Sequence, residues 1–471
     1  MTRLTFRTAG ESHGPAGLAL VEGVPAGLPL QVDHLDRDLA RRQQGYGRGR
    51  RMQIQQDRGE FLSGVRAGET LGSPIAILIR NKDWANWSAI MDPAPRPEDA
   101  TERGRARQVT RVRPGHADLT GLLKYDRTDA RDILERASAR ETVARVAAGA
   151  VARRLLDACE ITIGSHLVHL GGVDAASPTA WPADLNAAAD ASPVRCLDRD
   201  AEARMLAAID EAKAAGDTLG GICEVVVTGL PIGLGSHVAW DRKLDGRLAQ
   251  ALCSIPAVKG VEMGLGFDAA RRRGSAVHDA IVPDAGVTRR GHVRRETNHA
   301  GGLEGGMTTG EPLVLRVAMK PISTLMRPLA TVDTATGAPA EASVERSDVT
   351  AVPAMGVIAE AMTALVLADA LLERFGGDSL GELQRNLAAY LARVDERRDA
   401  LEQMYERLFE LALRLRVDAE LVGRGGECGL KVPLGGSGSI QVIDQRRIEV
   451  LLRGEGRADQ APDKRAEAAF P

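Results

Sequence analysis

Aromatic residues are scarce in this sequence, because Phe, Trp and Tyr together make up 3 % of its 471 residues. The formal net charge is −3 at pH 7, so no overall positive field attracts nucleic acid or an anionic membrane surface. The five cysteines are scattered and form no Cys-x-x-Cys pair, which predicts reduced thiols. His166 and His169 lie three positions apart in a strand-like run and point to opposite faces, so we expect no metal site. Glycine turns and charged side chains are left as the basis of function.

Membrane, secretory and nucleotide-binding signatures are also missing. The first residues carry no apolar stretch of the kind that a signal peptide needs. The most apolar run, Val352 to Leu372, contains Glu360 and Asp369, which predicts a buried core helix rather than a membrane span. No Gly-x-x-x-x-Gly-Lys segment or dinucleotide-binding turn occurs, so an NAD-dependent dehydrogenase is disfavoured. We expect a cytoplasmic protein with neither a membrane nor a nucleic-acid partner.

The sequence does contain a repeated pattern of turns, strands and helices. Segment 21–42 resembles 227–248, and segment 68–79 resembles 306–317. Each pair precedes a long Ala-rich helix, predicted at 129–159 and at 353–375. Two matching pairs in the same order predict an internal duplication, and two like halves usually pack their helices together. We therefore predict one α+β domain, a β-α-β sandwich with a helical core between its sheets.

The character of the sequence changes after Gly377. Residues 379–382, Ser-Leu-Gly-Glu, form a capping box that opens a helix. Apolar residues then recur every seven positions, a seam that packs against another helix of this chain or of a partner: Leu387, Val394, Leu401, Leu408 and Leu415. Strand-like runs follow at 429–434, 439–443 and 447–452, before a tail of disordered composition. We predict a catalytic domain at 1–390 and a C-terminal extension at 391–471.

Two histidines stand on glycine-rich turns, His13 in G-E-S-H-G and His116 in R-P-G-H-A-D. Each could transfer protons near neutral pH or merely bind a backbone carbonyl. About twenty residues after His116, the sequence places Arg136, Ser138 and Arg140 at helical spacing. A titratable group beside anion-binding groups indicates a site for a charged small molecule.

A second basic stretch, residues 40–52, holds five arginines among glycines: Arg41, Arg42, Arg48, Arg50 and Arg51. Arginine forks bind carboxylate and phosphate, and glycine lets the backbone approach an anion. The alternatives are a solvated basic loop or a single-stranded nucleic-acid site, although the latter usually has more aromatics than Tyr46 alone. Asp348, just before the second core helix, is either a helix cap or a functional carboxylate.

Seven motifs, in this order, resemble those of chorismate synthase. They are G-E-S-H-G, G-Y-G-R-G-x-R-M, R-P-G-H-A-D, R-A-S-A-R-E-T, N-H-A-G-G-L-E-G-G-M-T, K-P-I-S-T and R-S-D-x-x-A-V-P. The resemblance covers residues 1–390. It implies a carbon–oxygen lyase that completes the shikimate pathway by anti-1,4 elimination of phosphate from 5-enolpyruvylshikimate 3-phosphate, giving chorismate. It further implies reduced FMN (FMNH2) as cofactor and a homotetramer.

The resemblance also implies roles for individual residues. His13 would donate a proton to the leaving phosphate, His116 would protonate or stabilise the reduced flavin, and Asp348 would work near flavin N5. Substrate anions would be held by Arg42, Arg48, Arg51 and Arg140, the first two of which also match NADP positions of the family. FMN would lie against Arg136, Ala137, Ser138, Pro256, Ala257, Gly305, Lys320, Pro321, Ile322, Ser323, Thr324 and Arg346.

Two positions depart from the family pattern. Pro256 stands where a polar residue is expected and removes a backbone donor, and Thr309 stands where Asn is common. No nicotinamide site is recognisable. We therefore expect NADPH to act only as an indirect reductant, through a separate flavin reductase.

Overall fold

The computed structural model describes residues 4–49, 56–95, 108–284, 292–344, 348–396, 420–424 and 427–431. The chain divides into two units, Met1–Arg393 and Val394–Pro471. In the second unit, the strands that are described form an antiparallel hairpin of β18 (Glu420–Arg424) and β19 (Glu427–Lys431), which overlaps the strand predicted at 429–434. The runs predicted at 439–443 and 447–452 lie outside the described residues.

The first half of the larger unit is built on a four-stranded antiparallel sheet in the order β1-β2-β6-β3. Its main elements are β1 (Thr5–Ala9), β2 (Ala16–Glu22), α1 (Val32–Gln43), β3 (Gly59–Phe61), β6 (Ile75–Arg80) and α5 (Thr142–Asp157). Every second residue of β6, namely Ile75, Ile77 and Ile79, is fully buried. This period-two alternation turns one face of the sheet toward the helices.

The second half is built on a five-stranded antiparallel sheet in the order β10-β15-β9-β7-β8. Its main elements are β7 (Thr162–Leu170), β8 (Val173–Asp174), α6 (Leu185–Asp190), α7 (Arg199–Ala215), β9 (Gly221–Thr228), α8 (Leu244–Cys253), β10 (Val258–Met263), β15 (Leu313–Met319) and α9 (Val352–Phe375). Strand β9 carries the run of buried apolar residues expected of a central strand.

Short elements connect these parts. In the first half they are β4 (Val65–Arg66), β5 (Glu69–Thr70), η1 (Trp84–Asn86), α3 (Asp118–Tyr125), α4 (Arg131–Ala137) and η3 (Ala139–Glu141). In the second half they are η4 (Trp240–Arg242), η5 (Gly266–Arg271), η6 (Gly274–Ala276), β11 (Ile281–Pro283), β12 (Val293–Arg295), β13 (Leu303–Glu304), β14 (Met307–Thr308), β16 (Ala330–Val332) and β17 (Pro339–Glu341).

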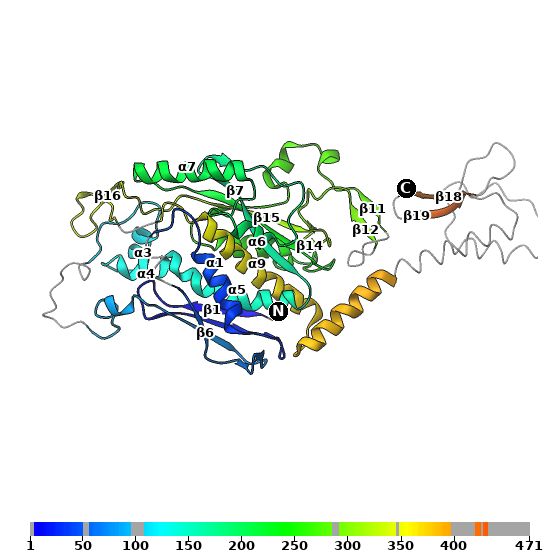
Figure 1. Ribbon diagram of the computed structural model, residues 1–471, viewed down its shortest axis with the longest axis horizontal. Helices are drawn as coiled ribbons and strands as arrows, with labels where there is room; N and C mark the ends of the chain where they lie inside the picture. Colours follow the sequence, from blue (N-terminus) through cyan, green and yellow to red (C-terminus); the bar gives the residue numbers. More distant parts are fainter. Residues whose placement is uncertain are drawn as a thin grey trace, which may run out of the picture. The chain divides into compact units, whose positions relative to one another are not determined.

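The two halves repeat the same path. The first runs β2–α1–β6–α5 and the second runs β9–α8–β15–α9, and in each half the two strands pair directly and antiparallel. Helices α5 and α9 lie between the two sheets (Figure 1). The predicted α+β sandwich with duplicated halves and a helical core is confirmed.

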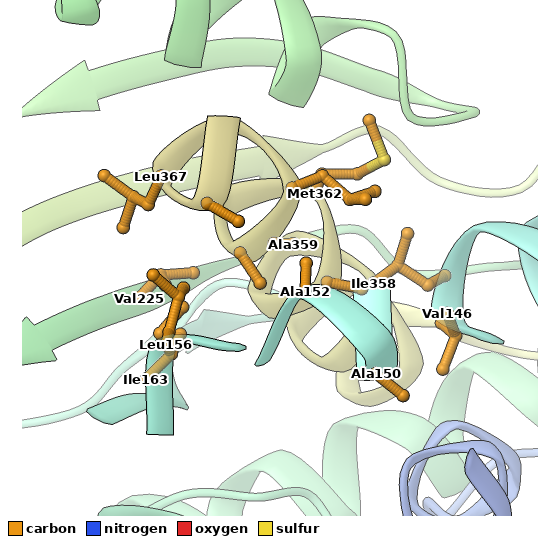
Figure 2. Close-up of a cluster of buried hydrophobic side chains, with 14 of the residues drawn as sticks. Val146, Ala150, Ala152, Leu156, Ile163, Val225, Ile358, Ala359, Met362 and Leu367 are labelled. Carbon is orange, nitrogen blue, oxygen red and sulfur yellow. The ribbon is translucent and has the colours of Figure 1, made fainter. Parts of the chain in front are cut away.

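The core is centred on the contact between α5 and α9. Figure 2 shows Ala152 of α5 next to Ala359 of α9, and Ala150 and Ile358 belong to the same buried hydrophobic cluster. A Cβ added at Gly149 would stand 2.4 Å from the Cβ of Ala361, so the backbones approach closely. The small residues of both helices therefore set the thickness of the helical layer.

Helix α9 is long and apolar enough to cross a membrane, but 94 % of its most apolar window is buried inside the protein. Its Glu360 is completely buried and accepts hydrogen bonds from the guanidinium groups of Arg41 (2.8 and 3.0 Å), Arg153 (2.7 Å) and Arg195 (3.1 Å), and from Ser165 Oγ (2.5 Å). The prediction of a core helix is thus confirmed, with its carboxylate paired inside the protein.

This Glu360 cluster is electrically balanced, because its three arginines face Glu360 and two further carboxylates, Asp38 and Asp190. Burial alone would raise the pKa of Glu360, but Arg41, Arg153 and Arg195 lower it to about 2. The carboxylate is therefore ionised at neutral pH. Arg41, which belongs to the basic stretch 40–52, serves the core rather than a ligand site.

In the described part of the chain, a further helix extends over residues 380–396. Its predicted capping box is present: Glu382 accepts hydrogen bonds from the backbone N–H groups of Asp378 (2.9 Å) and Ser379 (3.1 Å), and its own N–H donates to Ser379 Oγ at 3.4 Å. Leu387, the first seam residue, is buried in the main core. Leu401, Leu408 and Leu415 lie outside the described residues.

Candidate active site

The long helix predicted for residues 129–159 is broken at Ser138. The backbone of Ser138 is extended (φ −68°, ψ 145°), and its Oγ accepts the N–H of Arg140 at 3.3 Å, which caps η3. The predicted helical spacing of Arg136, Ser138 and Arg140 is therefore wrong. Serine can replace helical backbone hydrogen bonds with its own, which the local Ala-rich composition does not reveal.

His13 lies on the turn after β1 and contacts the end of α4. Its Nδ1 is 2.9 and 3.0 Å from the two carboxylate oxygens of Glu135, and its backbone N–H donates to Glu135 Oε2 at 2.8 Å. Burial alone would raise the pKa of Glu135, but hydrogen bonds and charge from His13, with the charge of Arg131, hold that pKa below its usual value. The ionised carboxylate accepts the Nδ1 proton, so Nε2 is the nitrogen that can exchange a proton with a ligand.

His116 is held in the same way on the turn before α3. Its Nδ1 is 2.5 Å from Oδ1 of Asp118, a fully buried carboxylate that also binds Arg113 Nε at 2.9 Å. Burial would raise the pKa of Asp118, but the hydrogen bonds from His116 and Arg113 hold it well below its usual range. Arg113 in turn donates to Thr324 Oγ1 at 3.1 Å, which joins the His116 turn to segment 320–324.

Arg42 and Arg140 face one carboxylate, Asp57. The Arg42 guanidinium lies 3.5 Å and the Arg140 guanidinium 3.6 Å from its two oxygens. Arg42 also donates to Thr142 Oγ1 at 3.0 Å and to the carbonyl of Ala139 at 3.1 Å, so it supports the turn that carries Arg140. The pKa of Arg42 is lowered to about 10, chiefly by burial. The positive charges of Arg48 and Arg140 also lower this pKa, whereas the negative charge of Asp57 raises it. This crowding of positive charge favours a bound anion.

Asp348 is paired with the Gly-rich segment of residues 45–49. It accepts the backbone N–H of Gly49 at 2.6 Å and lies 3.2 Å from Arg48 Nε. The alternative that Asp348 caps the second core helix is wrong, because α9 begins four residues later without a side-chain cap. Arg48, Asp348 and Thr324 line a cavity of about 560 Å³. The cavity thus lies between Arg48 and Thr324, and Thr324 binds Arg113 next to the His116 turn.

The turn at Pro256 and Ala257 accounts for the unexpected proline. The N–H of Val258 donates to the carbonyl of Ile255 at 3.1 Å, which closes a four-residue turn, and Ala257 has φ +67°. A proline at the second position and positive φ at the third define a type II turn. The backbone donor that Pro256 lacks is not needed there, and the carbonyl of Ala257 accepts the N–H of Lys320 at 3.0 Å.

Segment 320–324 lies against the His116 turn, where Ser323 Oγ donates to the carbonyl of Gly115 at 3.2 Å. The carbonyl of Ile322 accepts a hydrogen bond from Thr218, another residue of the cavity wall. Gly305 is not brought to this place. The carbonyl of the next residue, Gly306, accepts the N–H of Leu244 at the start of α8. Pro256 and Ala257 follow the other end of α8, and a ten-residue helix is roughly 15 Å long.

Other predicted residues have partners within the protein. Arg136 donates to the carbonyls of Thr8 and Gly10, each at 3.0 Å, and Ala137 is the last residue of α4. Ser138 Oγ is 3.2 Å from Ser12 Oγ, next to His13 in sequence. Pro321 is placed with segment 320–324, while Arg51 and Arg346 lie outside the described residues.

Several residues of the site were not singled out from the sequence: Arg113, Asp118, Glu135, Asp57 and Trp87. Arg113 and Asp118 belong to the R-P-G-H-A-D motif, so a search for a carboxylate beside each histidine would have found Asp118. Glu135 is separated from His13 by 122 positions, and nothing local marks it as a partner. The ring of Trp87 stacks on the imidazole of His13 with centroids 3.7 Å apart.

Comparison with known proteins identifies the family. The sequence profile described as chorismate synthase matches residues 4–372. The chain is 59 % identical to a chorismate synthase of Trichlorobacter lovleyi over 393 residues, covering 83 % of this chain and 99 % of the relative. It is 56 % identical to one of Symbiobacterium thermophilum over 397 residues, covering 84 % of this chain and 100 % of the relative. A crystal structure of chorismate synthase matches with a TM-score of 0.66 and 42 % identity, covering 84 % of this chain and 99 % of that one. The chain therefore belongs to the chorismate synthase family, the carbon–oxygen lyases that complete the shikimate pathway.

Proposed function

We propose that this protein eliminates phosphate from 5-enolpyruvylshikimate 3-phosphate to give chorismate, with reduced FMN bound beside the substrate. The observation that carries the proposal is a pair of carboxylate-bound histidines whose turns are linked to the arginine-bearing segments. The Oγ of Ser12, next to His13, lies 3.2 Å from the Oγ of Ser138 on the turn of Arg140, and Arg113 on the His116 turn binds Thr324 in the cavity wall that also includes Arg48. His13 and His116 each contact an ionised carboxylate through Nδ1, so we assign proton transfer to Nε2. The substrate carries a phosphate and two carboxylates, which suits the group formed by Arg42, Arg48 and Arg140.

In this proposal, the protein binds anions and holds protons. Arg48 and Arg140 contact substrate anions, while Arg42 supports the turn of Arg140 and contributes charge. Nε2 of His13 donates a proton to an oxygen of the departing phosphate. His116, on the turn that contacts segment 320–324, would stabilise reduced FMN. Asp348, in the cavity wall, would work near flavin N5.

The donors around segment 320–324 fit a flavin phosphate. The pKa of Lys320 is lowered by burial and by the neighbouring charge of Lys259. Two ammonium groups that repel each other are both stabilised by a bound phosphate. Ser323, Thr324 and Ala257 would complete the binding residues, together with Arg136 and Ser138, which contact Gly10 and Ser12 beside the His13 turn. Bound reduced FMN supplies the electron density needed to remove a C6 hydrogen that is not acidic.

We also propose a cytoplasmic homotetramer that receives reduced flavin from a separate NADPH-dependent reductase. The outward face of the first sheet exposes Leu18 (40 %) and Leu20 (39 %), an apolar surface that a second copy could cover. Mass measurement of the full chain, and of a chain ending at residue 396, tests the tetramer and the part played by the C-terminal extension. Oxidation of NADPH by the purified protein with FMN in the dark would contradict the external reductase.

The activity is tested anaerobically with substrate and chemically reduced FMN, by measuring released phosphate and chorismate together. We expect equal amounts of the two products with reduced FMN and none with oxidised FMN. His13→Ala and His116→Ala should each lower kcat about 100-fold or more, the usual contribution of a positioned proton donor. His169→Ala is the matched control, because His169 lies on β7 outside the site and is bound to the exposed Asp174 of β8. Absence of product with reduced FMN would sink the proposal.

A further inference from the structure

His13 is held by two residues, Glu135 and Trp87, that come from separate parts of the chain. Both oxygens of Glu135 lie within 3.0 Å of Nδ1, and one of them also accepts the backbone N–H of His13. The indole of Trp87 stacks on the imidazole, with ring centroids 3.7 Å apart and planes inclined by 24°. Such a ring cannot turn over without losing both contacts.

The two holding residues are themselves fixed. The Glu135 side chain is 2 % exposed, and Arg131 lies 3.4 Å from it on the same helix. Trp87 donates its Nε1–H to Asp83 at 3.0 Å, and the guanidinium of Arg131 stands over its ring at 5.4 Å. Arg131 thus contacts both supports, and the imidazole is placed by residues that also contact one another.

We propose that Glu135 and Trp87 are positioning residues that present His13 to the leaving group as an imidazolium, with Nε2 as the nitrogen that donates the proton. The proposal rests on the function proposed above, in which His13 protonates the departing phosphate. The Nε2 proton passes to a phosphate oxygen, the Nδ1 proton stays with Glu135 as its acceptor, and neutral His13 regains a proton from solvent. Glu135 remains ionised throughout, so it acts by charge and orientation only.

A purely structural role for Glu135 can be distinguished from an effect of its charge, because the backbone of Glu135 holds the turn independently of its side chain. The carbonyl of Glu135 accepts the N–H of Ser12 at 2.9 Å, a bond that any side chain at this position preserves. In Glu135→Gln the amide is the same size, but the imidazolium loses its counter-charge. Arg131 pairs with Glu135 on the same helix, and Glu11 lies on the turn that carries His13. The substitution therefore changes the protonation of His13 more than its surroundings.

Trp87 supplies a reporter that needs neither flavin nor substrate. A protonated imidazole quenches the fluorescence of an indole stacked on it, so the Trp87 signal follows the charge of His13. The difference between the wild-type protein and Trp87→Phe isolates this signal from the three other tryptophans. His13→Gln should abolish the pH transition, which assigns it to His13.

The test compares the wild-type protein with Glu135→Gln, Glu135→Asp and the matched control Asp132→Asn, an exposed carboxylate on the same helix paired with Arg127. In Glu135→Gln we expect the fluorescence midpoint to move to lower pH by about one unit. We expect kcat at pH 7.5 to fall about tenfold or more, KM to change less than threefold, and the lost rate to return as pH is lowered. For Glu135→Asp, the fluorescence midpoint and kcat should lie between those of the wild type and Glu135→Gln. For Asp132→Asn, both should match the wild type.

Two results overturn the proposal: an unchanged midpoint in Glu135→Gln, or a rate that is lost at every pH. If Glu135→Gln fails to fold by circular dichroism, Glu135→Asp carries the test, and an unchanged midpoint and rate there count against it. Failure of the proposed function is seen separately, as a wild-type protein that forms no chorismate. The fluorescence midpoints then still decide whether Glu135 sets the charge of His13.

Discussion

Replacement of Glu360 by glutamine should destabilise the protein strongly, although it removes no volume. The carboxylate is fully buried and accepts four hydrogen bonds from Arg41, Arg153 and Arg195. Glutamine leaves three buried guanidinium groups with one carboxylate fewer and turns an NH2 group toward one of them. Breaking a buried ion pair from one side costs about 3–5 kcal/mol, because the remaining charge is left uncompensated.

The matched control is Glu373→Gln on the same helix. Glu373 pairs with Arg242 and Arg247, but its side chain is 21 % exposed, so water compensates for the lost charge. Partly exposed ion pairs contribute about 1 kcal/mol or less. The two variants thus make the same chemical change on one helix and differ in burial.

Urea unfolding followed by far-ultraviolet circular dichroism measures the difference, since urea is uncharged and does not screen the cluster. For a unit of this size we expect the Glu360→Gln midpoint to fall by about 1 M and the Glu373→Gln midpoint to change by less than about 0.3 M. Equal midpoints for the two variants would show that Glu360 is not the charged centre of the core.

Three further predictions follow from the same contacts. Gly149→Ala should lower the thermal midpoint by about 2–4 °C, since about 3 kcal/mol of overpacking outweighs about 1 kcal/mol of helix propensity. Gly246→Ala on α8 should raise it, because a Cβ added there would meet only the Trp240 carbonyl oxygen, at an ordinary contact distance of 3.9 Å. A rise in both midpoints would refute the close helix contact. The pKa of Glu360 is lowered to about 2, so the carboxylate contributes fully to stability above its ordinary pKa near 4.5, and this contribution is lost as pH falls toward 2. Between these two pH values, the free energy of unfolding should fall more steeply with pH in the wild type than in Glu360→Gln. Asp118→Asn should lower kcat about tenfold or more with little change in KM, because His116 loses the carboxylate that fixes its Nδ1 proton, and steady-state kinetics that match the wild type would exclude that role.

The parts of the fold that repeat locally could be predicted from the sequence. The Gly-Pro turns mark the strands, and the small residues of α5 and α9 mark the two core helices. The break at Ser138 could not be predicted, because its neighbours all favour helix and the break depends on one hydroxyl group. Arg41 and Arg42 show a second limit. They are adjacent and chemically identical, yet about 100° of helix rotation sends the first to Glu360 and the second to the turn of Arg140.

The histidines of the site were found because each stands on a glycine turn within a recognisable motif. Their carboxylate partners differ in how far they lie from the histidines in sequence. Asp118 is two residues from His116 and could have been proposed, whereas Glu135 meets His13 only after β1 and α4 are folded together. A sequence without homologous sequences beside it carries no sign of that pairing. The roles of all these residues stay predictions until the variants are measured.

The packing of α5 against α9 has a consequence for synthesis of the chain on the ribosome. Roughly 220 residues separate the end of α5 from the end of α9. At about 5–20 residues per second, the apolar surface of α5 waits tens of seconds for its partner helix. The N-terminus is under the same constraint, because the N–H of Leu4 binds Asp369 on α9 at 2.8 Å. In the nascent chain, α5 can therefore be covered only after α9 has been synthesised. Chaperones that bind the apolar surface of α5 during this interval should increase the amount of folded enzyme.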